Sequence, residues 1–287
     1  MKTLAIGFVF LGYLLTRVVV KFIAALLVKA GMVKENYRAE TVPAALGLIF
    51  PLVFPLLAMV PQFLRLIGLE AGFPAGEFFA FLFYTTGFGL LGLADDLLKN
   101  DEAKGLRGHL TLLLKKGELT SGGLKALFGL LFSVIFVLGI GIPTGKDRWL
   151  LIPRVFLAAL APNILNLFDL RPGRAVKAFL GGLILILPAF LFMNGKSPIL
   201  GLIFLLLGAL AAYFPFDLQA RGMLGDTGAN YLGAVFAGLV ILERNSIMLL
   251  LLLLLFITLQ LIAEKISFTQ VIEKNALLKF IDDLGRE

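Results

Sequence analysis

The sequence predicts an all-α polytopic membrane protein with about nine transmembrane helices and a C-terminal amphipathic helix. Of the 287 residues, 59% are hydrophobic and only 16% are charged, which is too little charge for a soluble chain of this length. Several apolar stretches approach or exceed the roughly 20 residues that a helix needs to cross a bilayer. The stretches are continuous and rich in Leu and Phe rather than alternating. Since only helices and closed barrels span membranes, they indicate helices.

The first three predicted spans lead to an acidic pair. The first apolar run, 4–30, is too long for a cleaved signal peptide and lacks a following small-residue cleavage site. A polar loop separates it from the second run, 44–67, whose three prolines predict kinks. The third run, 77–94, ends abruptly at two adjacent carboxylates, Asp95 and Asp96. The longest polar stretch of the chain, rich in lysine, comes next.

Six further spans and a tail follow this polar stretch. The eighth span is short, so its start can reach back to Gly228. The six runs cover 124–142, 149–167, 178–192, 199–214, 231–242 and 247–263. Beyond them, apolar residues recur at roughly helical spacing with charges between, which is typical of an amphipathic helix on a membrane surface, although a solvated tail explains the pattern equally well. We divide the chain into a transmembrane domain, 1–264, and a cytoplasmic amphipathic tail, 265–287.

The distribution of basic residues predicts the topology. Most Lys and Arg residues lie in the loops after odd-numbered spans, so by the positive-inside rule these loops are cytoplasmic, with the N-terminus outside. Asp95, Asp96, Asp169 and Asp226 then all lie at the cytoplasmic boundary. A carboxylate there is costly unless it has a partner, which makes these acids candidates for a functional site.

Composition and residue type narrow the chemistry of this candidate site. The chain has no cysteine, and its one histidine, His109, excludes a multi-histidine metal site. The net charge of +7 suits anionic lipids or phosphorylated substrates, although topology-setting residues explain it as well. Carboxylates suit Mg²⁺, which binds through one or two protein acids and takes phosphate oxygens for the rest. Asp95 and Asp96 point about 100° apart on a helix, so we expect them to divide their roles.

Each acidic motif also has a plain structural explanation. An Asp pair can be a solvated helix end, the asparagines near Asp169 can satisfy helix-end carbonyls, and a Gly-Asp turn such as the one at Asp226 is common in loops. We favour a site because the three motifs lie in order on one predicted face. We expect Asp226 to sit in a tight glycine-flanked turn, where backbone can approach a ligand closely.

These motifs resemble those of the polyprenyl-phosphate N-acetylhexosamine-1-phosphate transferase family, glycosyltransferase family 4. That family includes the phospho-MurNAc-pentapeptide translocase and the undecaprenyl-phosphate GlcNAc-1-phosphate transferase. Its DDxxK motif matches Asp95, Asp96 and Lys99; its NxxNxxD motif matches Asn163, Asn166 and Asp169; its GDxGSxxLG motif matches Gly225, Asp226, Gly228, Leu232 and Gly233, with Ala229 in place of serine. Arg221 falls where the family carries a basic residue.

The resemblance implies an activity and a role for each residue. The reaction is Mg-dependent transfer of a sugar-1-phosphate from a nucleotide sugar, UDP-linked in the family, to undecaprenyl phosphate, with release of UMP. It implies Asp226 as the principal magnesium ligand and Asn166 as a second. One of Asp95 and Asp96 deprotonates or orients the lipid phosphate, and Lys99 neutralises the pyrophosphate of the sugar donor. The substrate-binding set that we expect is Asn163, Asp169, Arg221, Arg171 and Arg174.

The resemblance also implies a place and partners. It implies a multi-pass protein of the cell membrane, inner or plasma, that acts in cell-envelope polysaccharide or peptidoglycan biosynthesis. The expected partners are a polyprenyl phosphate lipid and a nucleotide sugar, with no nucleic acid. A homodimer stays an open alternative.

The chain departs from the family pattern where relatives recognise the sugar donor. Relatives continue the second motif as DGxDG, and their second Asp contacts uracil, whereas this chain has Pro172 there. It also lacks their histidine-rich motif and a tenth span. Arg171 and Arg174 flank Pro172 and can hold phosphates, or they can simply set topology. The alternatives to an active enzyme are a catalytically silent homologue that binds polyprenyl phosphate or partners an envelope complex, and a transporter.

Overall fold

The protein is a bundle of long helices. A computed structural model describes residues 2–69, 72–98, 121–193 and 198–286. Within these ranges, nine helices are long and apolar enough to cross a membrane, and a two-stranded hairpin is the one sheet. The predicted fold class, an all-α polytopic membrane protein, is therefore confirmed.

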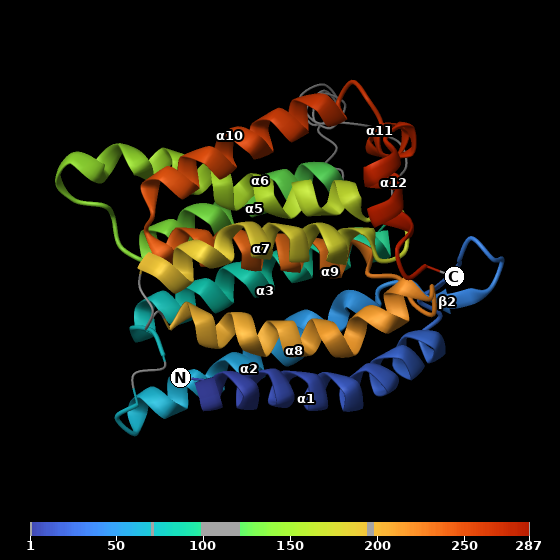
Figure 1. The fold of residues 1–287 in the computed structure, drawn as a ribbon, viewed down its shortest axis with the longest axis horizontal. Coiled ribbons are helices and arrows are strands. Elements are labelled where there is room, and N and C mark those ends of the chain that lie inside the picture. The colour runs from blue at the N-terminus through green and yellow to red at the C-terminus, as the bar shows by residue number, and fades with distance from the viewer. Residues whose placement is uncertain (1, 70–71, 99–120, 194–197, 287) are drawn as a thin grey trace.

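The long helices lie side by side, and the N- and C-terminal ends of the chain are at opposite ends of the bundle (Figure 1). The hairpin and the last two short helices gather at the C-terminal end, which we call the site end. The elements are α1 (Lys2–Lys29), β1 (Val33–Glu35), β2 (Thr41–Pro43), η1 (Leu46–Leu48), α2 (Ile49–Leu66), α3 (Ala75–Leu98), α5 (Ser121–Gly139), η2 (Gly145–Leu150), α6 (Leu151–Phe168), α7 (Arg174–Met193), α8 (Ile199–Leu218), α9 (Gly225–Glu243), α10 (Ser246–Ala263), α11 (Phe268–Lys274) and α12 (Ala276–Asp283).

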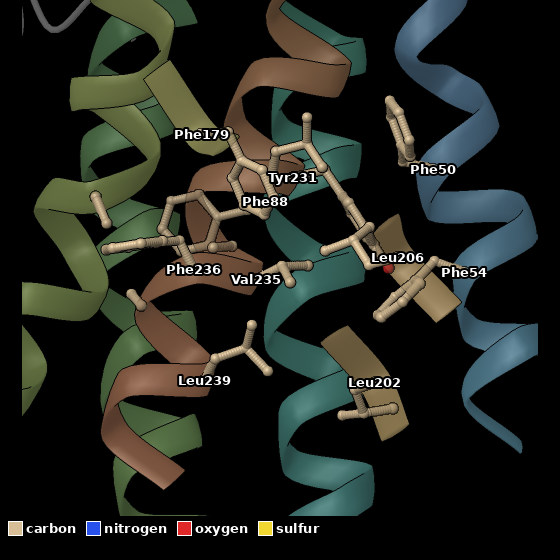
Figure 2. Packing of buried hydrophobic residues seen from close by; sticks show 14 of the residues in the cluster. Phe50, Phe54, Phe88, Phe179, Leu202, Leu206, Tyr231, Val235, Phe236 and Leu239 are labelled. Carbon is tan, nitrogen blue, oxygen red and sulfur yellow. The ribbon is translucent and has the colours of Figure 1, made fainter. Parts of the chain in front are cut away.

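Helix α9 is the centre of the bundle, and 89% of its span is buried inside the protein. Its side chains Tyr231, Val235, Phe236 and Leu239 are surrounded by apolar side chains from α2, α3, α7 and α8 (Figure 2). This burial explains why the polar start of α9 is held inside the protein and not in a surface loop. The eighth span begins at Gly225, earlier than predicted, so the expectation that Asp226 sits in a turn is wrong. Asp226 lies in the first turn of the helix.

Glycines allow α9 to approach its neighbours at backbone distance. A Cβ atom added to Gly92 on α3 would lie 2.2 Å from the backbone oxygen of Asp226, and one added to Gly233 would lie 2.6 Å from the backbone oxygen of Ala161 on α6. Small residues are the usual means of close helix packing in membranes. The contact at Gly92 brings the acidic end of α3 against the acidic start of α9.

The predicted polar loop after α1 is a β-hairpin fixed to the connection between α8 and α9. The Met223 backbone N–H donates to the Pro43 carbonyl at 2.8 Å, and the Leu46 N–H donates to the Met223 carbonyl at 2.8 Å. The Asn36 side chain donates to the Ala220 carbonyl at 3.0 Å. These bonds hold the hairpin beside the start of α9.

The C-terminal tail docks on the site end, which neither sequence alternative anticipated. The single predicted amphipathic helix is two helices, because the Asn275 side chain accepts from the N–H groups of Leu277 and Leu278 and caps α12. The Arg174 guanidinium donates to both carboxylate oxygens of Asp282 at 2.7 Å, and both side chains are 4% exposed. The tail is therefore part of the folded bundle.

Protonation of Asp282 is expected to release the tail at low pH. Burial alone would raise the pKa of this carboxyl, but hydrogen bonds from Arg174 and Arg286 outweigh it and lower the pKa from 3.8 to about 2. Because the folded-state pKa lies below the unfolded value, stabilisation of about 2 kcal/mol is present above about pH 4 and is lost toward about pH 2. Pepsin should therefore cut the tail faster at the lower pH, relative to an unfolded substrate digested alongside. Asp282→Asn should remove this pH dependence, and a wild-type tail with no pH dependence would contradict the assignment.

Candidate active site

The end of α3 caps the start of α9 through Asp96. One carboxylate oxygen of Asp96 accepts from the backbone N–H and the hydroxyl of Thr227, at 3.0 and 2.7 Å, and the other accepts from the Asp226 N–H at 3.2 Å. These N–H groups have no partner within the helix, and a carboxylate at a helix N-terminus is further favoured by the helix dipole. Asp96 thus fixes the position of Asp226.

A lysine bridges the other two acids at this junction. Lys125 on α5 places its ammonium 3.5 Å from a carboxylate oxygen of Asp95 and 3.8 Å from one of Asp226. The side chain of Lys125 is 15% exposed, so water screens these contacts only partly. Asp95 and Asp96 therefore face different partners, as their adjacent positions on a helix predict.

A cavity of about 590 Å³ opens beside this junction. It is walled by the hairpin, the ends of α6 and α8, the start of α9 and the tail, and it combines five carboxylates with three basic side chains. The charged residues in its lining are Lys34, Glu35, Asp96, Asp169, Arg171, Asp217, Asp226 and Arg286. Such a mixture suits a ligand that carries phosphates together with a divalent cation.

Two further acids, Asp169 and Asp217, line the cavity. Asp169 follows the last residue of α6, and Asp217 at the end of α8 accepts from the Gly173 N–H at 3.1 Å. Loss of hydration raises the pKa of Asp169 well above its ordinary value, and the negative charges of Asp217, Asp226 and Asp96 raise it further. These four carboxyl groups thus lie close enough to repel one another when charged, and a cation bound among them would relieve that repulsion.

The structure brings together some of the predicted residues and separates others. Asp96, Asp169, Arg171 and Asp226 line the cavity, with Asp95 beside them. Lys99 lies outside the described residues, as does His109.

Four predicted residues lie away from the cavity lining. Asn163 donates to the Gln260 side chain at 2.7 Å and faces α10. Asn166 is half-buried in the last turn of α6, and Arg221 is exposed. Arg174, a predicted phosphate-binding residue, is committed to Asp282, so we reassign it to holding the tail.

Sequence reasoning missed three residues, Lys125, Asp217 and Arg286. Lys125 stands near the start of an apolar helix, where a lysine is indistinguishable from a topology-setting charge. Asp217 and Arg286 belong to no motif that we identified, and only the tertiary packing of α8 and the tail brings them to the cavity. The sequence indicates that a basic side chain should lie near each acidic motif, but it does not indicate which Lys or Arg residue this is.

The donor set fits a magnesium ion that is completed by substrate. Among the described residues, no three His, Cys, Asp or Glu side chains are grouped so as to hold a metal alone. Two carboxylates, Asp95 and Asp226, nevertheless converge on one ammonium. Mg²⁺ commonly binds through one or two protein carboxylates, with water and phosphate oxygens supplying the rest. The residues present therefore fit a Mg–diphosphate ligand.

An apolar groove runs along the bundle next to the cavity. It has a volume of about 320 Å³ and lies between α6, α7, α9 and α10. Three glycines line it, Gly181, Gly182 and Gly233, and a Cβ added to Gly181 would meet nothing within 4 Å. Phe168 lines the groove, and the next residue, Asp169, lines the cavity, so the two spaces are neighbours.

Comparison with known proteins identifies the family. The family model of glycosyl transferase family 4 matches residues 78–243, more than half of the chain and nearly all of the junction described above. The chain belongs to glycosyl transferase family 4. Its three motifs lie within the matched region, so the resemblance inferred from the sequence is confirmed.

Curated members of glycosyl transferase family 4 resemble this chain over most of its length. A phospho-N-acetylmuramoyl-pentapeptide-transferase of Staphylococcus aureus (strain bovine RF122 / ET3-1) is 26% identical over 235 residues, covering 76% of this chain and 69% of its own length. One of Synechococcus sp. (strain JA-3-3Ab) is 28% identical over 243 residues, covering 83% of this chain and 66% of its own. One of Staphylococcus saprophyticus is 30% identical over 201 residues, covering 65% and 58%. The chain thus spans about three fifths to two thirds of these relatives.

Proposed function

We propose that this family 4 protein transfers a sugar-1-phosphate from a UDP-linked sugar to a polyprenyl phosphate, with Mg²⁺, at the cytoplasmic face of the cell membrane. The observation that carries the proposal is the junction of α3, α5 and α9, where Lys125 bridges Asp95 and Asp226 at the edge of a cavity lined by both acidic and basic side chains. The names of the relatives support a phospho-sugar as the transferred group.

The arrangement divides the two substrates between two spaces. The cavity has room and charge for the nucleotide and its diphosphate. The apolar groove beside it suits a polyprenyl chain, whose phosphate would then meet the cavity near Asp169. This placement makes the two phosphates neighbours, and positioning is the main requirement of phosphoryl transfer.

The residues then have separate roles in the reaction. A lipid phosphate oxygen attacks the sugar-bearing phosphorus of the donor, and the bond from that phosphorus to the bridging oxygen breaks, releasing UMP. Asp95 receives the lipid phosphate proton or orients that phosphate, because Asp96 is committed to the start of α9. Asp226 would hold the metal, and Arg171 would face the phosphates of the sugar donor. Bound Mg²⁺ would neutralise charge on the diphosphate.

Purified protein with undecaprenyl phosphate, Mg²⁺ and a panel of UDP-sugars should release UMP, and removal of Mg²⁺ by EDTA should stop the release.

UDP-MurNAc-pentapeptide should be turned over poorly, about one to two orders of magnitude below a bona fide translocase measured alongside. Pro172 offers no acceptor side chain and no N–H, and its carbonyl already accepts from Arg286. Efficient turnover of that donor would contradict the expected preference. No UMP release with any donor would instead favour a silent homologue that binds polyprenyl phosphate.

A further inference from the structure

The tail contributes Arg286 to the wall of the cavity and is held against the start of α7 by hydrogen bonds. Besides its two hydrogen bonds from Arg174, Asp282 accepts at its backbone carbonyl from the Lys177 ammonium at 2.6 Å. Arg174 also donates to the Thr269 hydroxyl at 2.9 Å. The ion pair is almost fully buried, so α12 has a fixed position against the start of α7.

Arg286 projects from this wall into the cavity lining. Its Nε donates to the Pro172 carbonyl at 3.2 Å, and its Nη2 donates to Asp282 at 3.0 Å. Its Nη1 lies 3.3 Å from acceptors on Asp282 and Asp283. The side chain is 12% exposed and lines the same cavity as Asp169 and Asp226. These contacts fix the guanidinium in place and leave Nη2 one hydrogen for a ligand.

Basic side chains of α7 and of the tail meet acceptors of the tail at this wall. Arg174 and Arg286 share the carboxylate of Asp282, Arg286 also donates to Asp283, and the Lys177 ammonium donates to the backbone carbonyl of Asp282. Arg171, the other arginine of the lining, is paired with Glu273 and is more exposed, at 38% against 12%. A guanidinium that is held in place, only 12% exposed and part of the cavity lining is suited to a phosphate.

We propose that Arg286 binds a phosphate of the nucleotide donor, and that Arg174 and Asp282 are positioning residues that hold it in the cavity. The identity of the ligand rests on the proposed function, but anion binding at Arg286 does not. The recognition of the sugar donor would then depend on the tail, which lies outside the region matched by the family model.

Binding of two probes to the full-length purified protein tests the proposal. Inorganic pyrophosphate and UDP, each with Mg²⁺, are titrated in equilibrium dialysis against wild type, Arg286→Gln, Asp282→Asn and a control, Lys279→Gln. The control removes an equal charge from an exposed position on α12, the short helix that precedes Arg286. Hydrogen–deuterium exchange of residues 276–286 reports whether the tail stays docked.

Arg286→Gln should weaken binding of both probes about tenfold or more without faster exchange in the tail, because Arg174 and Lys177 still hold Asp282. Asp282→Asn should weaken binding and also speed exchange, and the control should change neither. Wild-type-like binding by Arg286→Gln, no binding of either probe to wild type, or weakening accompanied by undocking in Arg286→Gln would each overturn the proposal. If the probes bind as expected while no UDP-sugar yields UMP, the proposed function fails and the assignment of Arg286 stands.

Discussion

Asp226→Asn is expected to lower turnover about a thousandfold, to or near background, without unfolding the protein. The side chain is 30% exposed, and its ion pair with Lys125 is long, at 3.8 Å, so the amide loses little packing. What it loses is a negative charge where the metal and diphosphate are proposed to sit, and such electrostatic contributions are among the largest in catalysis. Steady-state kinetics over a Mg²⁺ series, together with the melting temperature, measures both effects.

A matched control for this variant is Asp147→Asn. Asp147 is an exposed acid in η2, which leads into the start of α6. The cavity residue Asp169 follows the other end of that helix. It should keep wild-type turnover and the same magnesium dependence. Normal turnover and normal magnesium dependence in Asp226→Asn would show that the metal assignment is wrong.

Asp95→Asn and Asp96→Asn are expected to impair turnover severely, but only the second should also lower stability. Asp96 accepts three hydrogen bonds from the start of α9, and its amide would lose at least one of them. Loss of a helix cap costs about 1–2 kcal/mol, which would lower the melting temperature. Asp95→Asn should reduce kcat with lipid-phosphate binding largely kept, since it removes an interaction needed in the transition state.

Thr227→Val separates the two contributions of Asp96. It removes the hydroxyl that donates to Asp96 at 2.7 Å but leaves all charges in place, so it should lower stability by less than Asp96→Asn and keep measurable turnover. Comparison of the melting temperatures and kinetics of the three variants is the measurement. Indistinguishable profiles for Asp95→Asn and Asp96→Asn would argue against divided roles.

The transmembrane helices were predictable because a continuous apolar run of about 20 residues is long enough to cross a bilayer as a helix. The errors occurred where tertiary structure overrides local pattern. The start of α9 contains Gly225, Asp226 and Gly228, which indicate a turn, yet burial against α3 and the cap from Asp96 make it helical. The tail was predicted as a helix, but its docking depends on the pairing of Arg174 with Asp282, 108 residues apart in the chain.

The site was partly predictable for a related reason. Acids at membrane boundaries are costly, so Asp96, Asp169 and Asp226 signalled a site by their position alone. Lys and Arg residues at the same boundary can also set the membrane topology, so the sequence does not tell a site residue from a topology-setting one. Lys125 proved to bridge two of the acids, whereas Arg174, which flanks Pro172, proved to hold the tail.

The most direct test of the account follows the phosphorus atom. A UDP-sugar labelled with ³²P at the β-phosphorus is incubated with the protein, Mg²⁺ and undecaprenyl phosphate, and the organic phase is extracted. The account predicts that the label moves into the lipid together with the sugar, that unlabelled UMP appears in the aqueous phase, and that Asp226→Asn shows neither. Retention of the label in the aqueous phase, or transfer of sugar without it, would contradict a sugar-phosphate transferase.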